Sequence, residues 1–295
     1  MVIQWYPGHM SKALKMIDKE IKIVDAIIYV LDARAPFSCL NPKFTKLIDN
    51  KPFIYVLNKA DMTNDEITKQ WNSYFSKKGV CITLNSIQSG SAKKLESALF
   101  NVLKDKMQRF KDKNIFPTIR AMVIGVPNCG KSTLINNLSN KAKTLTGNKP
   151  GVTKGKQWIK LSDKIEVLDT PGTLWPAFNN NKIAKHLAYI GSIKEQVLDI
   201  NGLSLEFIND INLIDPNILK LRYNIDYDLV NTPSEILGKI CISRGLLVKG
   251  GKLDYERASL LLINEFKQGK LGKISLETVN DINEMLVNDR SNETD

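Results

Sequence analysis

The chain has 295 residues, of which 43% are hydrophobic and 25% charged, as is usual for a folded globular protein. No run approaches about 18 consecutive apolar residues, and charge recurs throughout the first 25 positions, so we expect neither a membrane span nor a secretory signal. Four scattered cysteines lack metal-binding spacing, which favours reduced thiols in a cytoplasmic protein.

Positive charge is concentrated in the first part of the chain. Residues 1–175 contain 28 Lys and Arg against 14 Asp and Glu, whereas residues 176–295 contain 14 against 17. Between Lys141 and Lys160 there are six lysines and no acid. Such a surface favours nucleic acid or another polyanion. A solvated lysine-rich face is the alternative, and charge alone does not separate the two.

The chain opens with an aromatic stretch in which Pro7-Gly8 predicts a turn, and an amphipathic helix is expected from Ser11. The apolar run Ala26 to Leu31 predicts a buried parallel strand that ends in Asp32-Ala33-Arg34. Parallel sheets place functional sites at the carboxyl ends of their strands. A short helix around residues 42 to 48 is expected next.

A second predicted strand, Phe53 to Leu57, leads into Asn58-Lys59-Ala60-Asp61. Asn-Lys-x-Asp is the guanine-recognition motif of GTPases. An ionised Asp61 accepts two N–H bonds from guanine that adenine does not offer, and an unpaired buried carboxylate would be costly. We expect Asn58 to orient the loop and contact the base, and the Lys59 stem to lie along the base plane.

A helix through Ile67 and Phe75 and a strand from Val80 to Leu84 are predicted next, followed by Asn85-Ser86. This pair occupies the place of a second guanine-contacting loop, where GTPases commonly have Ser-Ala. A helix from Lys93 to Met107 and a charged linker, Lys104 to Arg120, are expected before the next strand.

The stretch from Gly125 to Thr133 fits the phosphate-binding loop Gly-x-x-x-x-Gly-Lys-[Ser/Thr]. It follows an apolar strand pattern, residues 119 to 124, and precedes a helical one, so its backbone amides and the helix N-terminus would face phosphate oxygens. We expect Lys131 to reach the β- and γ-phosphates and Ser132 to hold Mg²⁺. The other predicted nucleotide-binding positions in this loop are Asn128, Cys129, Gly130 and Thr133.

Two further segments predict nucleotide-sensing switches. Thr153, in Gly151-Val152-Thr153, is expected to close on Mg²⁺ and the γ-phosphate. Two strands, residues 157–161 and 164–168, lead into Asp169-Thr170-Pro171-Gly172. We expect Asp169 to hold the Mg²⁺ water shell and the Gly172 amide to sense the γ-phosphate.

The order of these motifs is unusual, because the guanine motif precedes the P-loop. An ordinary GTPase has it downstream, so the order predicts a circularly permuted P-loop GTPase with a doubly wound, mostly parallel sheet. Helical patterns replace strand patterns after residue 176. We therefore expect a GTPase domain over residues 1–176 and a smaller all-helical domain over 177–295.

The motif order, Trp5-Tyr6-Pro7-Gly8-His9-Met10, Asp32-Ala33-Arg34 and the stretch Asp169 to Pro176 resemble the YlqF/RbgA family of circularly permuted ribosome-biogenesis GTPases. The resemblance covers nearly the whole chain. It implies GTP and GDP as ligands, and a role late in assembly of the large ribosomal (50S) subunit with subunit-stimulated hydrolysis. It also implies contact of the helical domain with rRNA; an ordinary solvated helix face is the alternative. Membrane and DNA are not expected partners, and a monomer is expected off the ribosome.

The catalytic group is not given by the usual motif, because Thr173 stands where many GTPases have a water-orienting Gln. The family places the loop containing His9 near the nucleotide, so His9 is the predicted catalytic residue beside Lys131 and Thr153. A structural or RNA-contacting role is its alternative. Asn128 is a candidate K⁺ ligand by resemblance to GTPases without an arginine finger, and His186 is expected to be structural.

Two other functions stay open at this point. One is an RNA- or ribosome-binding nucleotide switch with negligible hydrolysis of its own. The other is a nucleotide kinase, which would have no use for Asn58 and Asp61.

Overall fold

The computed structural model describes residues 8–44, 51–88, 90–115, 117–138, 157–175, 178 and 180–290. Six strands form one sheet in the order β3-β2-β1-β4-β6-β5, and only β5 is antiparallel to its neighbour. Their bounds are β1 (Ala26–Asp32), β2 (Phe53–Asn58), β3 (Val80–Thr83), β4 (Ile119–Ile124), β5 (Gln157–Ser162) and β6 (Ile165–Asp169). The predicted α/β fold with a mostly parallel sheet is confirmed.

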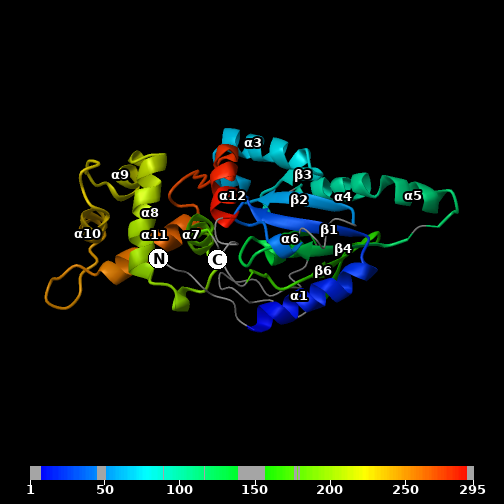
Figure 1. Cartoon of the computed structure of the whole chain (residues 1–295), viewed down its shortest axis with the longest axis horizontal. Helices are drawn as coiled ribbons and strands as arrows, with labels where there is room; N and C mark the ends of the chain where they lie inside the picture. The colour runs from blue at the N-terminus through cyan, green and yellow to red at the C-terminus, as the bar shows by residue number, and fades with distance from the viewer. Residues whose placement is uncertain are drawn as a thin grey trace.

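The central strands are apolar because both faces of the sheet are covered. Every residue of β1 is buried, and β2 and β4 each leave one residue less than fully buried. In the view of Figure 1, α3 (Asp65–Ser76) and α4 (Ser91–Val102) run above the strands and α1 (Gly8–Glu20) runs below them. This arrangement leaves the carboxyl ends of the parallel strands facing the region where the later helices gather.

Two predicted helices have different bounds in the structure. The first helix begins at Gly8 rather than after Ser11, so the backbone of His9 is helical instead of lying in a loop. A proline before the first turn is compatible with helix initiation, which explains why Pro7-Gly8 does not delay the helix. The predicted helix Lys93 to Met107 is instead two helices, because Leu103 leaves helical geometry between α4 and α5 (Lys104–Lys111). Half of the predicted linker is therefore helical.

Helices replace strands after residue 180. They are α7 (Asn181–Tyr189), α8 (Ile200–Ile214), α9 (Asn217–Tyr223), α10 (Pro233–Ser243), α11 (Tyr255–Lys267) and α12 (Ile282–Arg290). Helices α8 and α11 pack against each other through Phe207 and Phe266, whose ring centroids lie 4.9 Å apart. Figure 1 shows this helical group beyond one end of the sheet. No helix in the described ranges is long and apolar enough to cross a bilayer.

The segment after α11 returns to the sheet. Ile274 N–H donates to the Met62 carbonyl at 2.9 Å, and Leu276 N–H donates to the Arg34 carbonyl at 2.8 Å. The indole of Trp71 on α3 donates to the Glu277 carbonyl at 3.1 Å. The helical part of the chain is thus attached to the loops that follow β1 and β2, not only through the connection near residue 180.

Candidate nucleotide-binding site

The loops after β1, β2, β4 and β6 meet at one edge of the sheet. Parallel pairing aligns Asp32 with Asn58 at the ends of β1 and β2, and Asp169 with Val123 on β4. The sequence motifs therefore come together at the edge where α/β folds bind nucleotides.

The P-loop follows β4 with backbone angles that few side chains tolerate. Gly125 and Gly130 have φ of 150° and 97°, and Asn128 has φ of 59°. A Cβ at Gly130 would collide with the Asn58 side chain. Helix α6 (Lys131–Leu138) begins directly after the loop. Its amide-bearing N-terminus is therefore aimed at the place expected for phosphate.

Lys131 is buried and folded back over the loop. Its ammonium donates to the carbonyls of Gly125 at 3.1 Å and Val126 at 2.9 Å. The cation is thus held within the curl of the loop, where a phosphate anion can exchange for these carbonyls with little movement of the side chain.

Asn58 holds the guanine loops to the P-loop. Its amide donates to the Cys129 carbonyl at 2.8 Å, and its side-chain oxygen accepts from the Ser86 N–H at 3.1 Å and the Ser86 hydroxyl at 2.5 Å. Asn58 is 1% exposed. Asn58 therefore joins the loop after β3 to the P-loop, while its orienting role toward guanine and its contact with the base stay predictions.

Asp32 connects Lys59, the lysine of the guanine-recognition motif, to the buried Arg34. It accepts from Lys59 Nζ at 2.8 Å and from both Nε and Nη2 of Arg34 at 2.9 and 2.8 Å. Burial alone would raise the pKa of Asp32, but the Arg34 and Lys59 charges outweigh it and hold that pKa well below its usual range. Lys59 Nζ also donates to the Asn128 carbonyl at 2.7 Å, so this ionic chain reaches the P-loop.

The Asp-x-x-Gly segment lies against the P-loop. The Ser132 hydroxyl donates to Asp169 Oδ2 at 3.0 Å, which brings together the two predicted Mg²⁺-binding groups. A Cβ at Gly172 would lie 2.6 Å from backbone atoms of Pro127, so this close approach requires glycine. Changes at the phosphate site can therefore reach Gly172 directly.

Thr173 does not replace the missing glutamine. It is completely buried, its N–H donates to the Gly125 carbonyl at 3.3 Å, and its hydroxyl has no hydrogen-bond partner among the described residues. A side chain held in this way cannot orient a water molecule at the phosphates. The water-positioning group must come from another part of the site.

The other predicted site residues are placed as follows. Asp61 is exposed in the short helix Ala60–Met62, and the Asn85 side chain accepts from the Ile87 N–H at 3.1 Å. Thr133 is half-buried in the first turn of α6. Thr153 lies outside the described residues, and of His9 the structure describes only the helical backbone.

The helical part of the chain contacts the P-loop, which the sequence motifs did not indicate. The Asn128 amide donates to the Gly191 carbonyl at 2.7 Å, and the Ser192 hydroxyl donates to the Pro127 carbonyl at 2.7 Å. Both contacts come from the turn after α7, and no local signal in that turn separates it from any other. The P-loop is consequently held from two sides, by Asn58 and by this turn.

A second unexpected feature is the buried carboxylate of Glu277. It accepts from the N–H of Phe37 at 2.8 Å and lies 2.8 Å from His186 Nδ1. The Ser38 hydroxyl donates to the same carboxylate. His186 is 3% exposed, so it has a structural setting and fastens α7 and the returning segment to the loop after β1.

Together, the P-loop, the clamped guanine loops and the Ser132–Asp169 pair define a P-loop GTPase in which the guanine motifs precede the phosphate loop. Residues 120–231 match the family model described as "50S ribosome-binding GTPase". A ribosome biogenesis GTPase A from Bacillus cereus is 40% identical to this chain, and the match covers 97% of this chain and 97% of the relative. Another, from Thermotoga maritima, is 33% identical, and the match covers 95% of this chain and 96% of the relative.

Solved structures agree with this result. The crystal structure of GNP-bound YlqF from T. maritima is 30% identical, with a TM-score of 0.59 over 90% of this chain and 98% of that one. The GDP-bound structure of the T. maritima protein is 29% identical, with a TM-score of 0.58 over 90% of this chain and 100% of that one. This chain belongs to the ribosome biogenesis GTPase A family. It is a GTP-binding, GTP-hydrolysing ribosome biogenesis factor.

Proposed function

We propose that this GTPase binds the large (50S) ribosomal subunit and its rRNA, acts late in subunit maturation, and hydrolyses GTP faster when bound to the subunit. The observation that carries the proposal is the contact of the helical region with the P-loop through Gly191 and Ser192. A partner that moves this turn would act directly on Pro127 and Asn128, and the reverse coupling follows from linkage.

The two parts of the chain divide this work in the proposal. Residues 1–176 would form the nucleotide-binding domain, and residues 177–295 would form the helical domain that reports nucleotide state to the ribosome. Of the basic residues between Lys239 and Lys273, Lys249, Lys252 and Lys270 make no ion pair within the described residues. They are available to phosphate groups of rRNA.

Mg²⁺ is the proposed cofactor for hydrolysis. Hydroxyl and carboxylate oxygens are ligands that this ion prefers, and those of Ser132 and Asp169 already lie 3.0 Å apart. The ion would neutralise charge on the phosphates, while Lys131 would hold the same groups from the other side. Thr153 is proposed to complete the Mg²⁺ site, and the Asn128 side-chain oxygen to ligate K⁺.

The test combines sedimentation with kinetics. Purified large subunits should pellet the protein with a non-hydrolysable GTP analogue more strongly than with GDP, and should raise the GTPase rate well above that of the free protein. Depletion of the protein from cells should cause large-subunit precursors to accumulate, and sucrose gradients should reveal them. Equal pelleting with both nucleotides would contradict nucleotide-dependent binding.

The alternative is a ribosome-binding nucleotide switch whose own hydrolysis is negligible. The buried Thr173 favours this alternative for the free protein, because it leaves the attacking water without the usual glutamine. Both functions predict GTP-dependent binding. Only the proposed function predicts a hydrolysis rate that rises as large subunits are added and levels off when all of the protein is bound.

A further inference from the structure

The surface of α1 and α5 carries a strong excess of positive charge. Residues 12–25 and 104–120 contain ten Lys and Arg against five Asp and Glu. The resulting excess of five is nearly half of the formal net charge of +11, in about a tenth of the chain. The nucleotide site uses none of these residues.

The lysines of α1 form one row along the outer face of the helix and the turn after it. Lys12, Lys15, Lys19 and Lys22 are all exposed, and their spacing of three, four and three residues keeps them on one side of the helix. Core residues such as Met10, Ile17 and Ile21 occupy the opposite side. None of the four lysines makes an ion pair within the described residues. The row is roughly 15 Å long at about 1.5 Å per residue.

The row leads into a groove between α5 and the turn that follows α1. Ile23, directly after Lys22, is 52% exposed and lines a hollow of about 310 Å³ together with Met107, Phe110 and Lys106. Lys106 forms an ion pair with Asp25 across this hollow and lies 5.8 Å from the Phe110 ring centroid. The other exposed cations of α5 and of the turn after it are Lys104, Arg109, Lys111 and Lys113.

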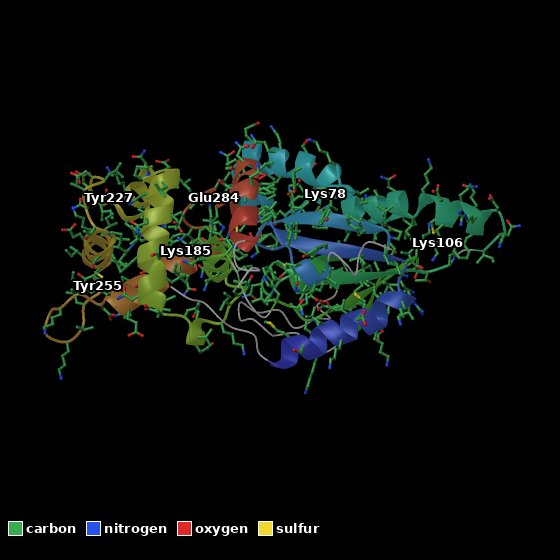
Figure 2. All side chains as sticks on the ribbon, viewed as in Figure 1. Lys78, Lys106, Lys185, Tyr227, Tyr255 and Glu284 are labelled. Atoms are coloured by element: carbon green, nitrogen blue, oxygen red, sulfur yellow. The ribbon has the colours of Figure 1, made fainter. Side chains whose placement is uncertain are left out.

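We propose that this lysine row and groove, Lys12 to Ile23 with Lys104 to Lys113, form a second RNA-binding surface, in addition to the helical domain. The proposal rests on the proposed ribosome binding and adds a place where rRNA is held. Figure 2 shows Lys106 at the end of the molecule opposite Tyr227 and Tyr255 of the helical part. The protein would then touch rRNA at both ends, with the nucleotide site between them.

The chemistry favours RNA over other polyanions. A linear row of lysines without ion pairs in the described part of the chain suits the repeated charges of a phosphodiester strand, and an apolar hollow containing a phenylalanine beside it suits an unstacked base. A membrane surface fits poorly, because the apolar face of α1 is buried in the core and cannot enter lipid.

The first test is a salt titration of binding to deproteinised 23S rRNA. The variant Lys12→Gln/Lys15→Gln/Lys19→Gln/Lys22→Gln should make the negative slope of log K against log salt shallower by roughly 3, since each phosphate contact contributes about 0.7 to 0.9 to its magnitude. Phe110→Ala should weaken binding roughly tenfold while leaving the slope unchanged, because a lost stacking contact between a base and the ring involves no counterion.

A matched control is Lys69→Gln/Lys77→Gln/Lys78→Gln/Lys93→Gln, which removes the same charge from exposed positions on and between α3 and α4. GTP affinity and the unstimulated rate should be unchanged in both quadruple variants. Equal slopes of log K against log salt for the α1 variant and the control variant would overturn the proposal while leaving the proposed ribosome binding intact. If the wild type binds neither rRNA nor subunits, the proposed function fails as well.

The same variants should be compared on whole large subunits. A loss of subunit binding by the α1 variant without any loss on deproteinised rRNA would assign the surface to a ribosomal protein, and the RNA proposal would be wrong. Parallel losses on both would support it.

Discussion

The guanidinium of Arg34 donates to the backbone carbonyl of Phe266 at 2.9 Å, although the two residues lie far apart in the chain. Phe266 is in the last turn of α11, where carbonyls lack partners within the helix and the helix dipole is negative. The Arg34 carbon Cζ also lies 4.7 Å from the Phe266 ring centroid. The end of β1 is thereby fixed to the helical region by a buried cation.

Replacing Arg34 should destabilise the protein strongly. Arg34→Met leaves the buried Asp32 with Lys59 as its one cationic partner among the described residues, and removing one member of a buried ion pair costs about 3–5 kcal/mol. The measurement is the free energy of unfolding in urea. Asp32→Asn/Arg34→Met, which also removes the carboxylate charge, should recover part of this loss. A double variant less stable than Arg34→Met would contradict an unpaired charge as the cause.

Acid should remove the contribution of Asp32. Its pKa in the folded protein lies well below the usual range, so the unfolded state binds the proton more readily. The stabilisation is therefore present above the unfolded pKa, declines from about pH 5 downward, and is lost as pH falls through the folded value. The difference in unfolding free energy between wild type and Asp32→Asn should shrink over this interval. A difference that stays constant below pH 5 would count against the ionic role.

Asn58→Ala should weaken GTP and GDP alike. The substitution removes hydrogen bonds to Cys129 and Ser86, and at about 1 kcal/mol each their loss lowers affinity by roughly 10²-fold. Nucleotide titration measures the effect. Asn101→Ala is a control, because Asn101 is exposed near the end of α4 and lies outside the predicted binding loops. A loss of affinity for GTP without a loss of affinity for GDP would indicate that Asn58 acts on the γ-phosphate site instead of the guanine loops.

Asp61→Asn should change the base preference. The amide reverses the donor and acceptor pattern presented to the base, so GTP should bind more weakly and xanthosine triphosphate more strongly. Asp61 is exposed, and its replacement should leave stability unchanged. Competition between the two nucleotides measures the preference. Unchanged GTP affinity would contradict the guanine assignment.

Much of the sheet and most of the binding loops were predictable from the sequence, because their signals are local. Apolar runs such as residues 26 to 31 mark buried strands, and Gly125 to Thr133 is a motif whose residue types follow from phosphate binding. The turn at Gly191 and Ser192 was not predictable, since its hydrogen bonds to the P-loop depend only on tertiary packing. Glu277 was missed for the same reason: a lone acidic residue in a polar segment gives no sign that it is buried.

The start of α1 and the break at Leu103 show the limits of boundary prediction. Pro7-Gly8 is compatible both with a turn and with the first residues of a helix, and the sequence does not decide between them. Leu103 is apolar and fits the helical repeat, yet its backbone leaves helical geometry. The first difference matters for function because it moves the backbone of His9 from a loop to the first turn of α1.

His9→Ala should separate binding from catalysis. Thr173 is buried and no glutamine follows Gly172, so another group must position the attacking water when the subunit is bound. If His9 supplies that group, its loss should lower the stimulated rate by roughly 10²–10⁴-fold and leave GTP and subunit binding near wild type. His9→Gln should retain more of the stimulated rate than His9→Ala, because an amide can also orient water.

The measurement is single-turnover hydrolysis with saturating large subunits, alongside the unstimulated rate. An alanine variant that keeps more than about half of the stimulated rate would give His9 a structural or RNA-contacting role, and would leave K⁺ at Asn128 or a ribosomal group as the source of stimulation.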